Sequence, residues 1–248
     1  IILLIKSYLK NIRFIYVIYR KYYFRFFFNK EKDLNFLKKN KFNYTVDIGA
    51  NVGTYMVQLQ YISQKVFCFE PIRVNHKYLN WLKKSNVTLF LTALGDRKEQ
   101  KIINIPKDSI NNRNYALASL ITKKKSNFYI QEKVNINTFD ATMKPNVFKK
   151  IDFIKIDVEG YESKVLFGMK NFLKKNRPIF LIEIEKKHNI NFYQVFLFMK
   201  KKNYEVYFTK DGDNLIKLPY KDIKKIKDKF IFKKKEINNF WFLQKGYL

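Results

Sequence analysis

Residues 46–53 read Val-Asp-Ile-Gly-Ala-Asn-Val-Gly, and they decide the fold class. They join a short apolar stretch, residues 44–48, to a segment with apolar side chains at helical spacing, residues 54–63. Gly49 can adopt backbone conformations closed to other residues, and Gly53 lets the helix begin close to the strand. The turn therefore presents backbone N–H groups and a helix N-terminus to a ligand at the carboxyl edge of a sheet.

Two acidic residues accompany this turn. Glu70 follows Asp47 by 23 residues and ends the next predicted strand, residues 65–69, where a carboxylate can bind two ribose hydroxyls. Asp47 ends the first strand, where its charge suits an ammonium group and would repel a pyrophosphate. The G-x-x-x-G spacing also lacks the third glycine of nicotinamide enzymes. Both features favour S-adenosylmethionine as the ligand; the alternative is that Asp47 only caps the turn.

Strands alternate with helices along the rest of the chain, which predicts an α/β fold with a parallel sheet and helices on both faces. The region 97–140 is less regular and is interpreted as an insertion with short strands at 102–105 and 134–137. Further helices are predicted at 73–84 and 192–202, further strands at 87–91, 204–209 and 239–244, and a turn at 210–213.

A second acidic group follows the predicted strand that begins at Ile151. With a two-residue period, Lys155, Asp157 and Glu159 point the same way at the end of this strand. Charged groups are rarely buried unless they are paired, so this pattern is unusual for a strand that only packs. Three roles stay open for the carboxylates: a general base, a grip on acceptor hydroxyls, or structural ion pairs with Lys155.

The chain resembles the FkbM family of methyltransferases over about residues 44–208. The resemblance is carried, in the family's order, by Val-Asp-Ile-Gly-Ala-Asn-Val-Gly at 46–53, Phe-Glu-Pro at 69–71, Ala-Leu-Gly at 93–95, Ile-Lys-Ile-Asp-Val-Glu-Gly-Tyr-Glu at 154–162 and Pro-Ile-Phe-Leu-Ile-Glu at 178–183. It implies a class I, Rossmann-like methyltransferase fold with a mostly parallel seven-stranded sheet whose last strand is antiparallel. It also implies methyl transfer from S-adenosylmethionine to a hydroxyl of a sugar, glycan or other small or lipid-linked acceptor.

The predicted site follows from the motifs and the resemblance together. The cofactor-binding candidates are Asp47, Gly49, Ala50, Asn51, Gly53, Glu70, Pro71 and Ala93, the last leaving room for the adenine ring. The catalytic candidates are Asp157, Glu159 and His188, and the substrate-binding candidates are Lys155, Glu162, Glu183 and Ser119. His188 would suit a base near neutral pH, although a lone loop histidine is also compatible with a solvated role. No metal is expected, although Asp157, Glu159 and Glu183 carry the hard oxygen ligands that a divalent ion prefers.

Composition limits the remaining classes. The 248 residues are enough for one α/β domain with an extension, divided here into an arm, residues 1–40, and a domain, residues 41–248. One cysteine and two histidines exclude a thiolate metal cage and suggest a reducing, cytoplasmic setting.

The net charge of +29 fits a polyanionic partner or an AT-rich coding bias. A nucleic-acid methyltransferase is disfavoured because Asp-Val-Glu-Gly does not match its Asn/Asp-Pro-Pro-aromatic motif; a non-catalytic membrane-associated binding protein is the other alternative.

The amino-terminal arm has an amphipathic pattern over residues 1–28. On a helix, five of its basic residues fall within about 100° of arc, opposite a wide apolar and aromatic surface; these residues are Lys6, Lys10, Arg13, Arg20 and Lys21. The pattern predicts a helix at an anionic membrane surface, peripheral at the inner face, with the basic stripe reaching the headgroups. The alternatives are a helix packed on the domain or paired with another chain.

Overall fold

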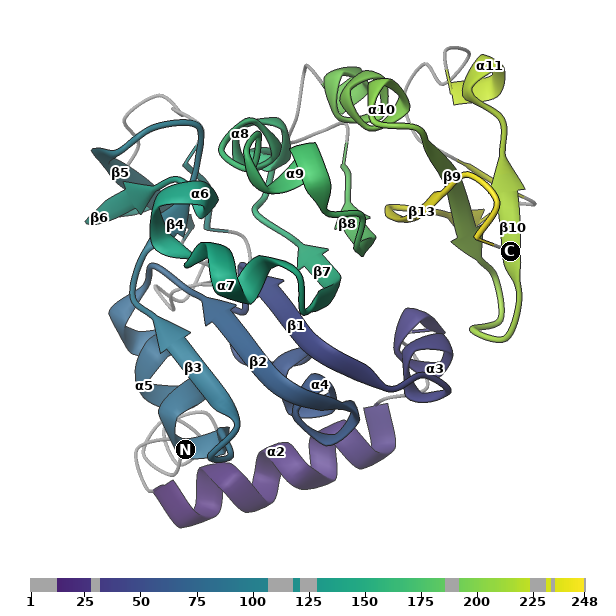
Figure 1. The fold of residues 1–248 in the computed structure, drawn as a ribbon. Helices are drawn as coiled ribbons and strands as arrows, with labels where there is room; N and C mark the ends of the chain where they lie inside the picture. Colours follow the sequence, from purple (N-terminus) through teal and green to yellow (C-terminus); the bar gives the residue numbers. More distant parts are fainter. Residues whose placement is uncertain are drawn as a thin grey trace.

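The computed structural model describes residues 13–27, 32–106, 118–120, 129–185, 192–223, 231–232 and 235–247. Five parallel strands form the centre of its main sheet (Figure 1), namely β3 (Val87–Phe90), β2 (Ser63–Phe69), β1 (Phe42–Ile48), β7 (Ile151–Ile156) and β8 (Ile179–Glu183), in that spatial order. The sheet continues beyond β8 with β13 (Asn239–Gln244), which is antiparallel to both of its neighbours, β8 and β9 (Tyr204–Thr209). This arrangement confirms the predicted class I methyltransferase fold with an antiparallel last strand.

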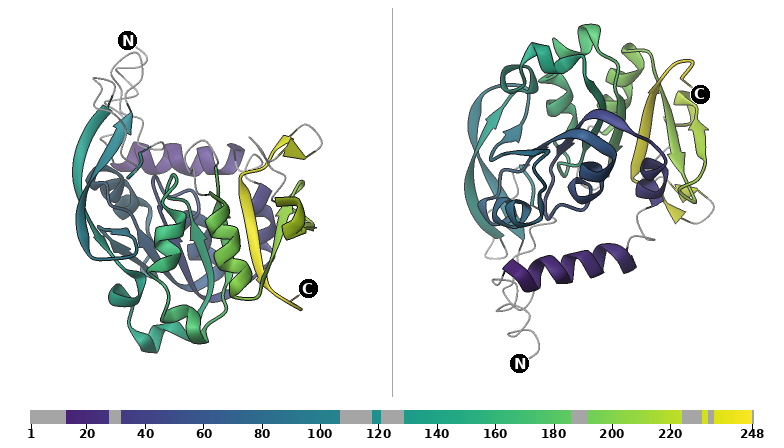
Figure 2. Two further views of the ribbon diagram at one scale, coloured as in Figure 1. Left: turned by 90° about the horizontal axis from the view of Figure 1, so that it is seen from above. Right: turned by 60° about the horizontal axis from the view of Figure 1, so that its bottom comes forward.

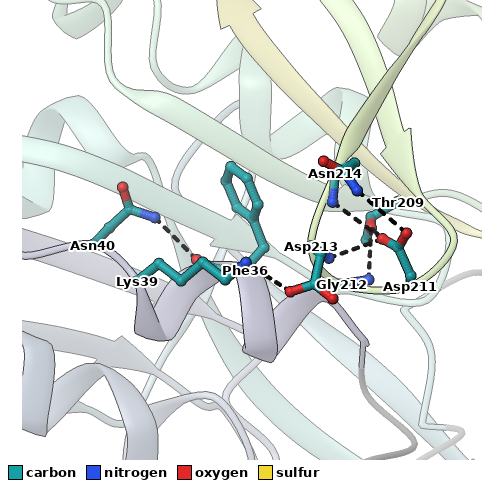
Figure 3. Close-up of polar contacts among 8 residues, drawn as sticks. All are labelled: Phe36, Lys39, Asn40, Thr209, Asp211, Gly212, Asp213 and Asn214. Carbon is teal, nitrogen blue, oxygen red and sulfur yellow. Dashed lines mark hydrogen bonds and ion pairs between the residues drawn. The ribbon is translucent and has the colours of Figure 1, made fainter.

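The predicted count of seven strands is wrong, because the sheet has an eighth, β10 (Leu215–Leu218), antiparallel to β9. The predicted turn at 210–213 is the connection of a β9–β10 hairpin. Gly212 has a φ of 84°, and the Asp211 carboxylate accepts the N–H groups of Asp213 and Asn214 at 2.8 and 3.1 Å (Figure 3). Four residues after a polar turn give too short a pattern to identify a strand, and pairing with β9 forms it.

Helices cover both faces of the main sheet (Figure 1). Val46, Ile154 and Phe180 face α8 (Glu162–Phe167), α9 (Phe172–Lys175) and α10 (Phe192–Lys201) in one apolar cluster. The alternate residues Phe153 and Leu181 face α3 (Lys32–Lys38), α4 (Met56–Ile62) and α5 (Arg73–Leu82) in the other. Short helices α6 (Phe139–Thr142), α7 (Pro145–Phe148) and α11 (Tyr220–Ile223) lie in connections.

The region 97–140, predicted as a loose insertion, contains a second sheet with its own apolar cluster. The long antiparallel pair β5 (Glu99–Pro106) and β6 (Tyr129–Asn137) includes both predicted short strands, and β4 (Ala93–Leu94) pairs with β6. Ile103, Ile105 and Val134 pack there with Ile72 and Tyr161. This sheet therefore joins the insertion to the ends of the main strands. A further two-stranded pair consists of β11 (Ile231–Phe232) and β12 (Lys235–Glu236).

The arm contains helix α2 (Arg13–Phe27), which lies outside α5 as an outer layer (Figure 2), and α3, which belongs to the core. Leu34 and Leu37 of α3 are fully buried, and Asp33 accepts a hydrogen bond from the Trp241 indole at 2.5 Å. Lys39 of the following turn pairs with Asp213 at 2.6 Å, which fixes α3 against the β9–β10 hairpin (Figure 3).

The predicted basic stripe of the arm is corrected at Arg20. This side chain is buried and donates to the Val52 carbonyl at 3.1 Å, so it faces the domain and not the solvent. Lys6 and Lys10 lie outside the described residues. None of the described helices combines the length and the apolar character that a membrane-spanning helix needs.

Candidate active site

The turn after β1 has the backbone conformation that its glycines predict. Gly49 and Gly53 have φ values of 82° and 91°, and Asn51 between them also lies in the left-handed region, at 49°. The N–H groups of Gly49 and Ala50 donate to the Phe69 carbonyl at 2.9 and 3.1 Å, which fixes the turn to the end of β2. These backbone hydrogen bonds to β2 therefore hold the turn at the carboxyl edge of the sheet.

Gly49 has a second role that the sequence did not reveal. A Cβ atom at this position would lie 1.8 Å from the carbonyl oxygen of Asp157. The turn after β1 and the loop after β7 therefore touch backbone to backbone, since the Asp157 N–H also donates to the Ile48 carbonyl at 2.9 Å. Only glycine allows this approach, so the two predicted motifs form one unit.

Glu70 lies at the end of β2, as predicted, and is tied to the same turn. One carboxylate oxygen accepts the Asn51 N–H at 2.8 Å, and the other accepts the Ile72 N–H at 2.9 Å and the Asn75 side-chain amide at 3.4 Å. Burial raises the pKa of Glu70 to about 7, and these donors only partly offset it. Asn75 was missed from the sequence; its signal is a polar side chain on the buried side of α5.

A pocket of about 600 Å³, open to solvent at its mouth, lies between the turn after β1, the loop after β7 and the second sheet. It contains seven predicted site residues: Gly49, Asn51, Glu70, Pro71, Ala93, Asp157 and Glu159. Apolar side chains that sequence reasoning missed, among them Ile72, Leu94, Ile103 and Leu120, complete the wall. The mixed polar and apolar lining is typical of a small-molecule site.

Asp47, Ala50 and Gly53 do not line this pocket, although Ile48, the neighbour of Asp47, does. The Asp47 carboxylate is buried and accepts a hydrogen bond from the Met56 N–H, as the alternative of a turn cap predicts. The oxygen Oδ2 is buried without a hydrogen-bond partner among the described residues. Burial raises the pKa of Asp47 to about 7; Lys155 lowers it and Asp157 raises it further. An orphaned buried carboxylate oxygen is suited to a ligand cation, so the residues present fit a ligand with an ammonium group.

Binding of S-adenosylmethionine should therefore release protons near pH 6. Free Asp47 is largely protonated below its pKa of about 7, and an adjacent ligand ammonium lowers that pKa, so affinity should rise with pH from 6.0 to 7.5. The expected change is up to about tenfold for one carboxyl group. Calorimetry in two buffers of different ionisation enthalpy measures the released protons directly. The same affinity at pH 6.0 and pH 7.5, together with no proton release, would show that Asp47 does not bind the ligand.

Four neighbouring strands bring polar groups together around Lys155. Its ammonium is buried and lies 3.6 Å from both Asp157 Oδ2 and Glu183 Oε2, 3.2 Å from Asn239 Oδ1 and 4.8 Å from the Tyr55 ring centre. Burial alone lowers the pKa of Lys155, but Asp157 and Glu183 outweigh it and raise the pKa above its ordinary value. Lys155 is therefore a buried cation that contacts two acidic side chains, and this placement does not support the predicted direct contact with an acceptor.

The loop after β7 departs from the predicted alternation. The strand ends at Ile156, and Glu159 has a φ of 52°, so Glu159 does not continue the line of Lys155 and Asp157. Buried Ser119 donates to the Glu159 carbonyl at 2.9 Å, and Glu162 accepts the Gly160 N–H at 2.7 Å. These contacts of Ser119 and Glu162 fix the loop that carries Asp157 and Glu159 at the pocket.

Glu183 ends β8 beside Asp157. Its Oε1 accepts the Asn238 side-chain amide at 2.7 Å, and Asn238 also donates to Glu185 at 3.2 Å. Burial and then the Asp157 charge raise the pKa of Glu183 well above its ordinary value, although Lys155 lowers it, and this favours the protonated form of Glu183 beside Asp157. His188 lies outside the described residues, and across the described ranges no three His, Cys, Asp or Glu side chains are grouped to hold a metal ion. Asn238 and Asn239 were missed, since only pairing of β13 with β8 brings them here.

The sheet order and the turns at its carboxyl edge define the class of protein as a class I methyltransferase. The Methyltransferase FkbM domain model matches residues 47–206, more than half of the chain. The chain therefore belongs to the FkbM methyltransferase family, which confirms the resemblance and, with it, S-adenosylmethionine as the cofactor.

Solved structures of similar proteins were also found. An FkbM methyltransferase from Methylobacillus flagellatus is 13% identical with a TM-score of 0.48; the match covers 81% of this chain and 43% of that one, so this chain spans less than half of its length. A putative methyltransferase from Streptococcus mutans in complex with SAH is 13% identical, with coverage of 86% and 95% and a TM-score of 0.45. An rRNA methylase from Streptococcus thermophilus is 13% identical, with coverage of 87% and 97% and a TM-score of 0.41. No curated protein matches the chain.

Proposed function

We propose that this methyltransferase is an O-methyltransferase that acts on a hydroxyl of a sugar, glycan or other neutral polyol, free or lipid-linked. The observation that carries the proposal is the Asp157 carboxylate, which lines the pocket and is contacted by Lys155 and Glu183. A hydroxyl is a poor nucleophile until a base removes its proton, and a positioned carboxylate can accept that proton as the new bond forms.

The cofactor would be held by groups that the turn supplies. Asp47 would meet its ammonium group, Glu70 its ribose hydroxyls, and the wall at Ala93 and Leu94 would leave room for its adenine. When bound, S-adenosylmethionine supplies a methyl group on a positively charged sulfur.

The chain's own groups then provide base and alignment. Asp157 accepts the hydroxyl proton of the acceptor. Glu183 donates its proton in a hydrogen bond to Asp157, and Lys155 holds both groups in place. Because the displacement is in line, alignment of the acceptor oxygen contributes much of the acceleration, and the two bonded loops keep base and cofactor turn in a fixed relation.

The charge of the pocket favours a neutral acceptor over a nucleic acid. Three carboxylates, those of Glu70, Asp157 and Glu159, line it, and within the described residues no lysine or arginine does. A phosphodiester would be repelled at this place, whereas sugar hydroxyls are good donors to carboxylates. The net charge of +29 is therefore not a feature of the pocket itself.

Incubation with methyl-labelled S-adenosylmethionine tests the proposal. The label should enter a glycan or glycolipid fraction of a host extract and should survive mild alkali, because an ether is stable where a methyl ester is cleaved. Total RNA added in parallel should stay unlabelled. Label that is found in RNA, or that alkali releases, would refute O-methylation of a hydroxyl acceptor.

A further inference from the structure

Helix α2 packs on the domain with an unusual orientation. Its inner face is formed by Tyr16, which stacks on Tyr78 at 4.5 Å and meets the edge of Trp81 at 5.6 Å, and by Arg20, which donates to Val52. Residues four apart lie on one side of a helix, so Tyr16 and Arg20 together define the side that faces α5 and the cofactor turn. The helix thus turns a cation inward.

Exposed apolar and aromatic side chains lie on the opposite side of α2. Phe14 and Ile18, again four residues apart, form what we call the outer ridge, and their side chains are 73% and 38% exposed. Tyr22, on the next turn along the same line, is 61% exposed. A helix on a water-soluble domain usually buries its apolar stripe and exposes its charges, whereas α2 buries Arg20 and exposes Phe14 and Ile18. An exposed apolar ridge on an outermost helix marks an interaction surface.

Charge indicates what covers the outer ridge. Residues 1–30 contain seven lysines and arginines and no aspartate or glutamate. Arg13 on α2 is exposed, and so is Lys77, which lies 4.9 Å from the ring of Trp81 beside the inner face. Apolar side chains flanked by cations alone match a bilayer surface with anionic headgroups.

We propose that α2 is an interfacial helix that lays the outer ridge into the headgroup region of an anionic membrane, while Tyr16 and Arg20 hold the methyltransferase domain to its inner face. The helix lies flat and does not span the bilayer. Since Arg20 binds Val52 in the turn between Gly49 and Gly53, the cofactor site would lie directly behind the membrane-bound helix. The inference is independent of the acceptor and of the reaction.

Vesicle flotation with the full chain tests this surface. The protein should float with phosphatidylcholine vesicles that contain phosphatidylglycerol and stay behind with phosphatidylcholine alone. The double variant Phe14→Ser with Ile18→Ser should bind the anionic vesicles about tenfold or more weakly, since two apolar side chains no longer insert. The matched control, Ile102→Ser with Leu197→Ser, changes residues that are 50% and 39% exposed on β5 and α10 and should float like the wild type.

Two further measurements make each outcome decisive. An unchanged thermal melt and retained binding of S-adenosylmethionine would show that the double variant is folded. Light scattering of the wild type and the double variant reports self-association through the same ridge. Equal flotation of the wild type and the double variant, flotation with neutral vesicles, or a dimer that the double variant dissociates would each overturn the proposal.

Discussion

Replacement of Asp157 with Asn is expected to abolish methyl transfer while binding of S-adenosylmethionine is retained. Asparagine keeps the size of the side chain but cannot accept the acceptor proton, and a positioned base contributes about 10²- to 10⁴-fold in rate. The fold should tolerate the change. Removal of the Asp157 charge lowers the pKa of Glu183, which can then ionise and balance the buried Lys155.

The measurement is single-turnover transfer of labelled methyl into the glycan fraction, together with calorimetric binding of the cofactor. Asp152→Asn is the matched control: Asp152 lies at the start of the same strand, where it accepts the Asn43 N–H at 2.6 Å. Transfer by Asp157→Asn within a few-fold of the wild type would show that another group is the base. Loss of cofactor binding would instead place Asp157 in the cofactor site.

Replacement of Gly49 with Ala is expected to remove cofactor binding and to destabilise the domain by about 3 kcal/mol or more, because it combines a left-handed residue with a backbone overlap. The new Cβ would lie 1.8 Å from the Asp157 carbonyl oxygen, so the turn after β1 and the loop after β7 must separate. The single methyl group that this substitution adds would therefore displace both the cofactor turn and Asp157, the proposed base.

Gly246→Ala provides an unusually close control. Gly246 has the same φ of 82°, but a Cβ there meets nothing within 4 Å. It should cost only the conformational penalty, about 1–2 kcal/mol, and leave cofactor affinity unchanged. The difference between the two variants in urea unfolding therefore isolates the contact with Asp157. Equal stability losses would mean that the two loops do not depend on this approach.

The parts of the site that were predictable are those encoded within single motifs. The turn at 46–53 and the acidic end of β2 are local patterns, and their order along the chain defines the parallel sheet. Asp157 was predictable as a site residue because an acidic residue directly after a buried strand can be identified in the sequence alone. Gly49, Asn51, Glu70 and Asp157 from these motifs line one pocket.

The parts that were missed depend on pairing between distant segments. Asn239 reaches Lys155 across 84 residues, and Trp241 reaches Asp33 across 208, only because β13 enters the sheet beside β8. Sequence periodicity gives the side of a strand on which a residue lies, but not the register that determines its neighbours. The predicted position of Arg20 on α2 was wrong for a related reason. A basic stripe shows which residues share a face of a helix, but the packing of Tyr16 on Tyr78 determines which face turns toward the domain.

Binding of S-adenosylmethionine to the purified chain is the most direct test that the turn after β1 is the cofactor site. Isothermal titration should give saturable binding at one site, and Asp47→Ala and Glu70→Ala should each abolish it while the fold is retained. No measurable binding to the wild type, or unchanged affinity in Asp47→Ala and Glu70→Ala, would contradict the account.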